Sequence, residues 1–146
     1  MTESFDLDRF RAAQDNAGTF ARALAELRDG RKVTHWMWFV FPQLEGLGQS
    51  PTSQRYAIRS LDEAEAYLRD PVLGSRLVEC ASVLAALDGL SAERILGAID
   101  ALKLRSSMTL FARAAPELGA FGEVLGKYFD GAADATTETL LQTGRR

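Results

Sequence analysis

Apolar residues recur at helical spacing along most of the chain. The clearest stripe runs from Leu73 to Leu87 in steps of four, three, four and three residues, so its side chains share one face of a helix. Asp70-Pro71 before the stripe and Asp88-Gly89 after it are typical start and stop signals. The pattern therefore predicts a helix whose apolar face lies against a core.

Similar stripes predict helices over most of the remaining sequence. The expected helices cover residues 5–16, 19–28, 61–68, 91–104, 107–115, 116–131 and 134–141. We expect the first two to form an antiparallel pair, and residues 143–146 to be frayed. No alternating strand pattern extends beyond residues 36–40. The predicted fold class is therefore all-α, a single-domain bundle of about seven to eight short helices over residues 1–146.

Residues 30–53 break the helical pattern. This segment contains both tryptophans, the only histidine, two of the four prolines and three of the twelve glycines. A helical bundle does not need such a segment for its own stability, and loops carried on a rigid scaffold often hold functional residues. We therefore predict that this irregular, aromatic-rich segment forms the functional region.

Composition and charge exclude several classes of protein. The 146 residues are 47% hydrophobic, and the net charge of −3 is divided as −2 over residues 1–73 and −1 over residues 74–146, so no basic half is available for nucleic acid. The most apolar run, Trp36 to Phe41, is too short to span a membrane. The acidic beginning of the sequence is unlike a signal peptide. We expect a cytoplasmic protein that binds neither nucleic acid nor membrane.

His35 is the first candidate for a catalytic role. An imidazole exchanges a proton near neutral pH without help, which suits a general acid or base. The alternative is a histidine packed among its aromatic neighbours with its ring nitrogens bonded to backbone. Cys80 lies on the apolar stripe described above, so its thiol is expected to be buried and unreactive.

Metal binding is weakly supported by the sequence. Zinc takes about four His, Cys or carboxylate ligands, and this chain has one histidine and one cysteine, so zinc is excluded. A magnesium ion held by carboxylates stays open. We assign no residue to a metal, and the sequence identifies no cofactor.

The aromatic run at 36–41 carries more large apolar side chains than one face of a helix or strand can bury. Either both faces pack into the core, or one face meets a ligand. In the second case a tryptophan can stack on a base, the neighbouring cations can bind phosphate, and the glutamine that follows can read an amide or base edge. A turn-stabilising bond would explain the glutamine equally well. The candidate ligand-binding residues of this segment are Arg31, Lys32, Trp36, Trp38 and Gln43.

A second polar cluster lies at residues 100–107. Asp100 and Lys103 are three positions apart on a predicted helix and can pair with each other, and Lys103 is also a candidate ligand-binding residue that could hold phosphate. Ser106 and Ser107 precede an apolar turn, where the free N–H groups of a helix start can bind an anion; simple capping by a serine is the alternative.

Four motifs together resemble a bacterial family of unknown function. The motifs are AQ at 13–14, ELRDGRK at 26–32, HWMWFVFPQLEGLG at 35–48 and DALKLRSSMTLF at 100–111. The family consists of small all-helical proteins, includes a hypothetical mycobacterial protein, and has members that sometimes carry an automatic calpastatin label. The resemblance extends from about residue 7 to residue 129. It implies an all-α fold and no established reaction.

A fainter resemblance is to small helical proteins that process ADP-ribose and related ribosides derived from NAD. These proteins also combine an early helix bearing an AQ pair, here Ala13-Gln14, with an aromatic-rich core and Asp and Lys residues in the site. Their glutamate, histidine and tyrosine element does not align with this chain. The resemblance adds Gln14 to the candidate ligand-binding residues and leaves the activity a hypothesis.

These observations lead to two hypotheses about function. In the first, segment 30–53 forms a polar and aromatic pocket with the helices of Gln14 and Asp100. The pocket binds a nucleotide-like ligand derived from NAD or ADP-ribose, and Asp100 and His35 act on an N-glycosidic bond. In the second, the chain has no enzymatic activity, and the run from Trp36 to Phe41 is exposed as an anchor for another protein. Exposure of the tryptophans distinguishes the two.

Overall fold

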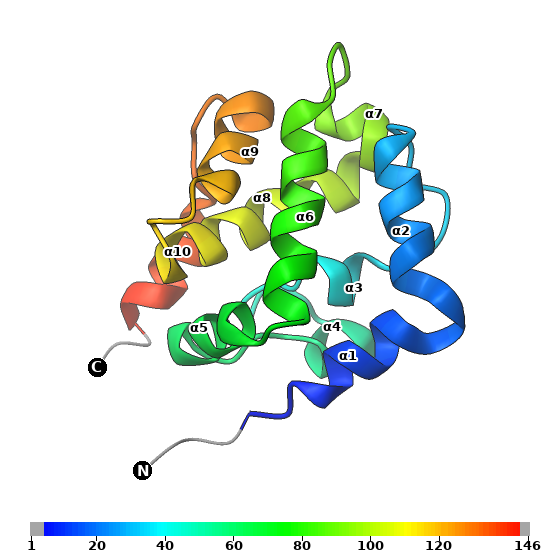
Figure 1. Ribbon diagram of the computed structural model, residues 1–146. Coiled ribbons are helices and arrows are strands. Elements are labelled where there is room, and N and C mark those ends of the chain that lie inside the picture. The colour runs from blue at the N-terminus through cyan, green and yellow to red at the C-terminus, as the bar shows by residue number, and fades with distance from the viewer. Residues whose placement is uncertain (1–4, 144–146) are drawn as a thin grey trace.

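The computed structural model describes residues 5–143, and its regular structure is helical throughout that range (Figure 1). In chain order the helices are α1 (Asp8–Asp15), η1 (Asn16–Gly18), α2 (Thr19–Arg28), α3 (Met37–Val40), α4 (Pro51–Arg55), α5 (Leu61–Arg69), α6 (Leu73–Ala86), α7 (Ala92–Leu96), α8 (Ala98–Ala114), α9 (Gly119–Phe129) and α10 (Ala135–Thr143). The all-α class is confirmed. Residues 144–146, most of the segment expected to be frayed, lie outside the described residues.

Helix α6 forms where the sequence predicts it. The Asp70 carboxylate accepts the backbone N–H groups of Val72 and Leu73, each at 3.0 Å, and so caps the start of the helix. The predicted stripe faces inward, and α6 packs against α2, α5 and α9. The buried members of the stripe are Leu73, Leu77, Cys80 and Leu84. Burial raises the pKa of the Cys80 thiol to about 12, so the expected lack of reactivity has a physical cause.

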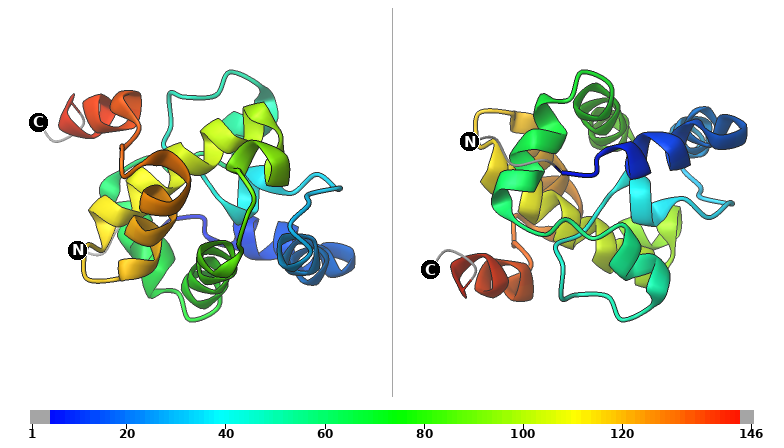
Figure 2. Two further views of the ribbon diagram at one scale, coloured as in Figure 1. Left: turned by 90° about the horizontal axis from the view of Figure 1, so that it is seen from above. Right: turned by 90° about the horizontal axis from the view of Figure 1, so that it is seen from below.

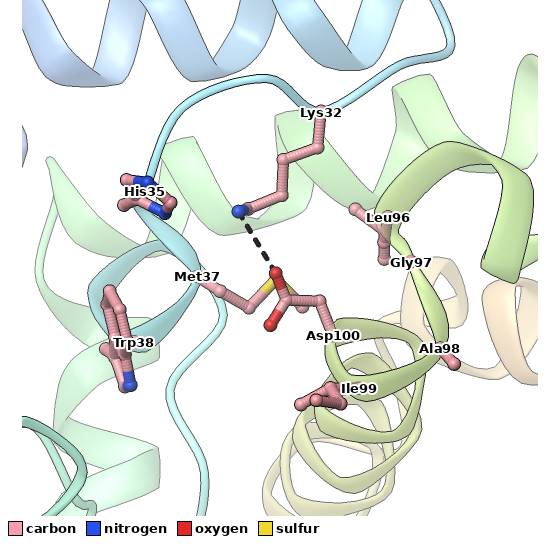
Figure 3. Close-up of a pocket in the computed structure, with 9 residues that line it drawn as sticks. All are labelled: Lys32, His35, Met37, Trp38, Leu96, Gly97, Ala98, Ile99 and Asp100. Carbon is pink, nitrogen blue, oxygen red and sulfur yellow. Dashed lines mark ion pairs between the residues drawn. The ribbon is translucent and has the colours of Figure 1, made fainter.

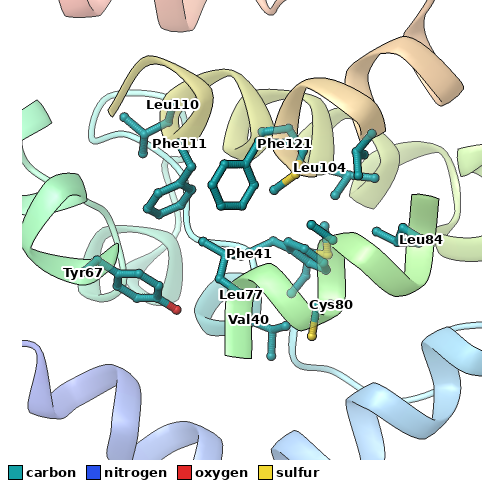
Figure 4. Close-up of a cluster of buried hydrophobic side chains, with 14 of the residues drawn as sticks. Val40, Phe41, Tyr67, Leu77, Cys80, Leu84, Leu104, Leu110, Phe111 and Phe121 are labelled. Carbon is teal, nitrogen blue, oxygen red and sulfur yellow. The ribbon is translucent and has the colours of Figure 1, made fainter. Parts of the chain in front are cut away.

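The expected break between two helices near residue 105 is wrong, because α8 runs unbroken from Ala98 to Ala114. Residues 106–111 are all buried. Tertiary packing against α5, α7, α9 and α10 therefore covers the two serines that resembled a helix start. In the centre of the molecule this helix meets the large apolar side chains of its neighbours (Figure 4). Among these contacts, the centroid of the Phe111 ring lies 5.3 Å from the centroid of the Tyr67 ring and 5.9 Å from that of the Phe121 ring.

The expected antiparallel pairing of the first two helices is also wrong. Ala17 and Gly18 take φ values of 54° and 71°, which turn the chain sharply inside η1. As a result, α1 lies across the end of α2 instead of alongside it (Figures 1 and 2). None of the helices within residues 5–143 is both long and apolar enough to span a membrane.

Candidate functional site

A cleft of about 440 Å³ opens between the segment that follows α2 and the start of α8 (Figure 3). One wall comes from the irregular segment 30–53, and the other from the turn between α7 and α8. The lining is largely apolar, with a few charged groups that converge on one point, as is typical of small-molecule sites. The lining residues are Lys32, His35, Met37, Trp38, Leu96, Gly97, Ala98, Ile99 and Asp100.

The end of α2 directs the chain into the first wall. Gly30 takes a φ of 74°, and its N–H donates to the Leu27 carbonyl at 2.9 Å. The Arg31 N–H donates to the Glu26 carbonyl at 3.0 Å. These two bonds form the Schellman motif that ends many helices, and glycine suits it because other residues are strained at positive φ. The motif fixes the direction in which residues 31–36 leave the helix.

The Glu26 carboxylate holds residues 33–36 in place. It accepts the N–H groups of Val33 and Thr34 at 2.8 and 3.0 Å, the Thr34 hydroxyl at 2.6 Å and the Trp36 indole N–H at 2.9 Å. Burial would raise the pKa of this carboxyl, but the hydrogen bonds from Thr34, Val33 and Trp36 outweigh it and lower the pKa to about 2. Glu26 is therefore a fixed anion around which this part of the wall folds.

A glycine turn positions the second wall. Gly97 joins α7 to α8 with a φ of 90° and a ψ of 160°, a backbone conformation that favours glycine. Just before this turn, the Ile95 carbonyl accepts the backbone N–H of Lys32 at 2.7 Å. This bond joins the two walls, and it sets the Lys32 side chain opposite the first turn of α8.

Three charged side chains meet at the cleft: Lys32 and Asp100 line it, and Lys103 lies beside it, next to two of the lining residues. Lys32 Nζ lies 3.0 Å from one Asp100 oxygen, and Lys103 Nζ lies 3.5 Å from the other. The Lys103 ammonium also stands 4.9 Å from the centroid of the Trp38 ring. Asp100 is in the first turn of α8, where a negative charge is favoured. The cluster carries one more positive than negative charge, so it suits an anionic ligand.

The two tryptophans have different environments. Trp36 is fully buried and donates to Glu26, so it cannot stack on a ligand. Trp38 is half-buried and lines the cleft, and His35 is exposed beside it, with both side chains facing the cleft from the first wall (Figure 3). Most of the aromatic run therefore packs into the core, and it does not form an exposed anchor. The buried members of the run are Trp36, Met37, Val40 and Phe41.

Gln14 lies outside the cleft, in a separate polar network. Its side-chain amide donates to the Phe39 carbonyl at 2.8 Å and to the Tyr67 hydroxyl at 3.2 Å, while Arg76 donates to its carbonyl oxygen at 3.1 Å. Both ends of the buried amide are thus occupied. Gln14 joins α1 to α3, α5 and α6, and the structure gives it no place beside the other candidates.

Four further candidates do not line the cleft. Ser106 donates to the Leu102 carbonyl at 3.2 Å, and Ser107 is buried in the core with no partner for its hydroxyl among residues 5–143. Both are inside α8, so the anion site expected at a helix start does not exist. Gln43 is half-buried where residues 43–45 pair with Ile58, and Arg31 is exposed at the end of α2.

Sequence reasoning missed Glu26 and the Gly97 turn. Glu26 lies three positions from the buried Ala23 and next to the buried Leu27, so it is a carboxylate on the apolar face of a helix. That placement is a readable signal, because a buried charge needs partners. The helix expected over residues 91–104 is wrong, because Gly97 divides it into α7 and the start of α8; the signal for this turn was weak, a single glycine inside the apolar pattern. In the described residues, no group of three or more His, Cys, Asp or Glu side chains could hold a metal ion.

The chain is similar to proteins whose function is unknown. The family described as "Protein of unknown function (DUF1810)" matches residues 4–141. Among solved structures, the crystal structure of the conserved hypothetical protein Rv1873 from Mycobacterium tuberculosis is 51% identical in sequence, with a TM-score of 0.92 over 96% of this chain and 99% of that chain. The comparison with curated proteins gave no match. The predicted family resemblance is confirmed, and neither description names a ligand or a reaction.

Proposed function

This chain belongs to the DUF1810 family, and we propose that its cleft binds a nucleotide-like ligand, an anion that carries a planar aromatic ring. The observation that supports this best is the convergence of Lys32, Asp100 and Lys103 beside the half-buried Trp38. Ammonium groups bind phosphate, and an indole face stacks on bases of any kind. The cleft volume of about 440 Å³ falls within the usual range for small-molecule sites.

The same cleft offers groups for a reaction on that ligand, hydrolysis of an N-glycosidic bond. Asp100 can stabilise the positive charge that develops on the ribose, and His35 can exchange a proton on the opposite wall. The bond between ribose C1′ and the base nitrogen would break, and the base would leave with the electron pair and a proton from the His35 imidazolium. Water would add to C1′ and return a proton to the imidazole.

Binding can be tested by thermal shift with AMP, NAD, ADP-ribose, free bases and sugar phosphates. A ligand at 100 times its dissociation constant adds about 2.7 kcal/mol, which raises the melting temperature of a domain of this size by about 5–10 °C. We expect such a shift with the phosphorylated nucleosides. An absence of any shift across the panel would contradict the proposed function.

The location of the site can be tested with two matched lysine variants. Lys32→Met removes the ammonium that faces Asp100 at 3.0 Å, whereas Lys127→Met removes one on α9, away from the cleft, that faces Asp88 at 3.8 Å. We expect the thermal shift to disappear in the first variant and to remain in the second. Equal shifts in both would place the ligand elsewhere.

Catalysis can be tested separately, by following release of the base chromatographically. We expect Asp100→Ala and His35→Ala to bind AMP or ADP-ribose detectably but to lose base release. A protein that binds these ligands and releases no base would be a binding protein, and the proposed hydrolysis would then be wrong.

A further inference from the structure

Lys103 stands between the two features that the proposed ligand would use. Its Nζ is 4.9 Å from the centroid of the Trp38 ring and 3.5 Å from an Asp100 oxygen. Because one ammonium contacts both groups, it covers the face of Trp38 that looks toward Asp100. A planar ring can stack on that face only if the ammonium moves away.

Moving this ammonium leaves Asp100 with a partner. Lys32 Nζ is closer to Asp100, at 3.0 Å, and its side chain is 9% exposed, against 22% for Lys103. A solvent-accessible ion pair and an accessible cation–π contact each contribute little to stability, so the Lys103 ammonium can leave both at small cost. Lys103 is thus the exchangeable cation of the cluster, and Lys32 is the fixed one.

We propose that Lys103 makes the cleft selective for planar aromatic ligands that carry an anion, over the same rings without one. This inference rests on the proposed function. When such a ligand enters, its ring takes the place of the ammonium on Trp38, and the displaced ammonium pairs with the anion of the ligand. A neutral nucleoside displaces the same ammonium and offers it no partner, so it binds more weakly.

The test is calorimetric titration with AMP, adenosine and inorganic phosphate. The proteins are the unmodified chain, Lys103→Ala and a control, Lys127→Ala. Lys127 is a close match for Lys103, because its ammonium also contacts an aspartate and an aromatic ring. Its Nζ lies 3.8 Å from an Asp88 oxygen and 6.0 Å from the centroid of the Tyr128 ring. Lys103→Gln, which keeps most of the side-chain length, provides a second variant if the alanine variant folds poorly.

The two ligands should respond to Lys103→Ala in opposite directions. In the unmodified chain we expect AMP to bind about tenfold more tightly than adenosine, as one charge-assisted contact would give. The variant should bind AMP about tenfold more weakly, and adenosine about threefold more tightly, because Trp38 is uncovered. Lys127→Ala should leave both affinities unchanged, and phosphate alone should bind far more weakly than AMP.

The outcomes separate this inference from the proposed function. An unchanged ratio of AMP to adenosine affinity in both Lys103 variants, with AMP still bound, would overturn the inference and leave the proposed function standing. Phosphate that binds as tightly as AMP would also overturn the inference, because the ring would then be unused. Failure of the unmodified chain to bind AMP or adenosine would overturn both.

Discussion

Two carboxylates at the cleft have opposite surroundings. Glu26 is 9% exposed, and its oxygens accept four hydrogen bonds from uncharged groups of residues 33–36. Asp100 has a side chain that is 18% exposed, and it faces the ammonium groups of Lys32 and Lys103. The donors around Glu26 are mostly backbone and ring N–H groups, which cannot move independently of the fold. The partners of Asp100 are the ends of flexible side chains.

The difference separates a structural carboxylate from one that is available for chemistry. Every bond to Glu26 also fixes the wall of the cleft, so a ligand could compete for Glu26 only by disrupting that wall. At Asp100 a ligand can replace one ammonium without disturbing the backbone, because long charged side chains form weak, adaptable pairs in water. We therefore expect Glu26 to be structural, and Asp100 to be the carboxylate that a ligand can reach.

The contrast between Glu26 and Asp100 predicts its largest effect on stability at the two tryptophans. We expect Trp36→Ala to lower the free energy of unfolding by about 4 kcal/mol, because it empties a buried site and removes a donor from Glu26. Trp38→Ala should cost about 1 kcal/mol, since its ring is half-buried at the cleft. Urea denaturation measures both. Equal losses would mean that the two tryptophans do not differ in how they are packed.

Acid should reveal the contribution of Glu26. Its pKa falls from 4.5 to about 2 on folding, so its stabilisation is complete above pH 4.5 and is lost as the pH falls toward 2. By linkage, this lowering of the Glu26 pKa corresponds to about 3 kcal/mol of the free energy of unfolding. We expect Glu26→Gln to remove most of this acid-dependent loss, measured by urea denaturation at pH 2.5 to 6. The control Glu79→Gln removes an exposed carboxylate that pairs with Arg28 at 3.3 Å, and should leave the dependence intact.

At Asp100 the change in stability should be small. We expect Asp100→Ala to lower the free energy of unfolding by about 1 kcal/mol. The substitution removes a solvent-accessible pair of ion contacts, with Lys32 and Lys103, and a favourable negative charge in the first turn of α8. The same variant should keep a detectable thermal shift with AMP and lose base release. A loss of stability as large as that of Trp36→Ala would show that Asp100 is structural, and the contrast with Glu26 would fail.

The sequence predicted the fold better than the site. Helix α6 could be read from its stripe and from Asp70, because local spacing and capping agree with the tertiary packing. The continuity of α8 could not, since the burial of Ser106 and Ser107 depends on helices that are distant in sequence.

At the site, the sequence predicted four of the lining residues and the packing of segment 30–53 against the helix of Asp100, but not the contacts between their side chains. Those four are Lys32, His35, Trp38 and Asp100. The pairing of Lys32 with Asp100 joins residues far apart in the chain and depends on the hydrogen bond from the Lys32 N–H to Ile95. Gln14 was a reasonable candidate from its motif, but it is held in a network whose partners no local pattern shows.

The most direct test of the central claim is a nuclear magnetic resonance titration of the ¹⁵N-labelled protein with AMP. The chain has two tryptophans, so it gives two indole N–H signals, which Trp36→Phe and Trp38→Phe would assign. We expect the signal of Trp38 to move with AMP, together with backbone signals of residues 96–100, while the signal of Trp36, bonded to Glu26, stays in place. Movement of the Trp36 signal alone, or no movement at millimolar AMP, would contradict the account.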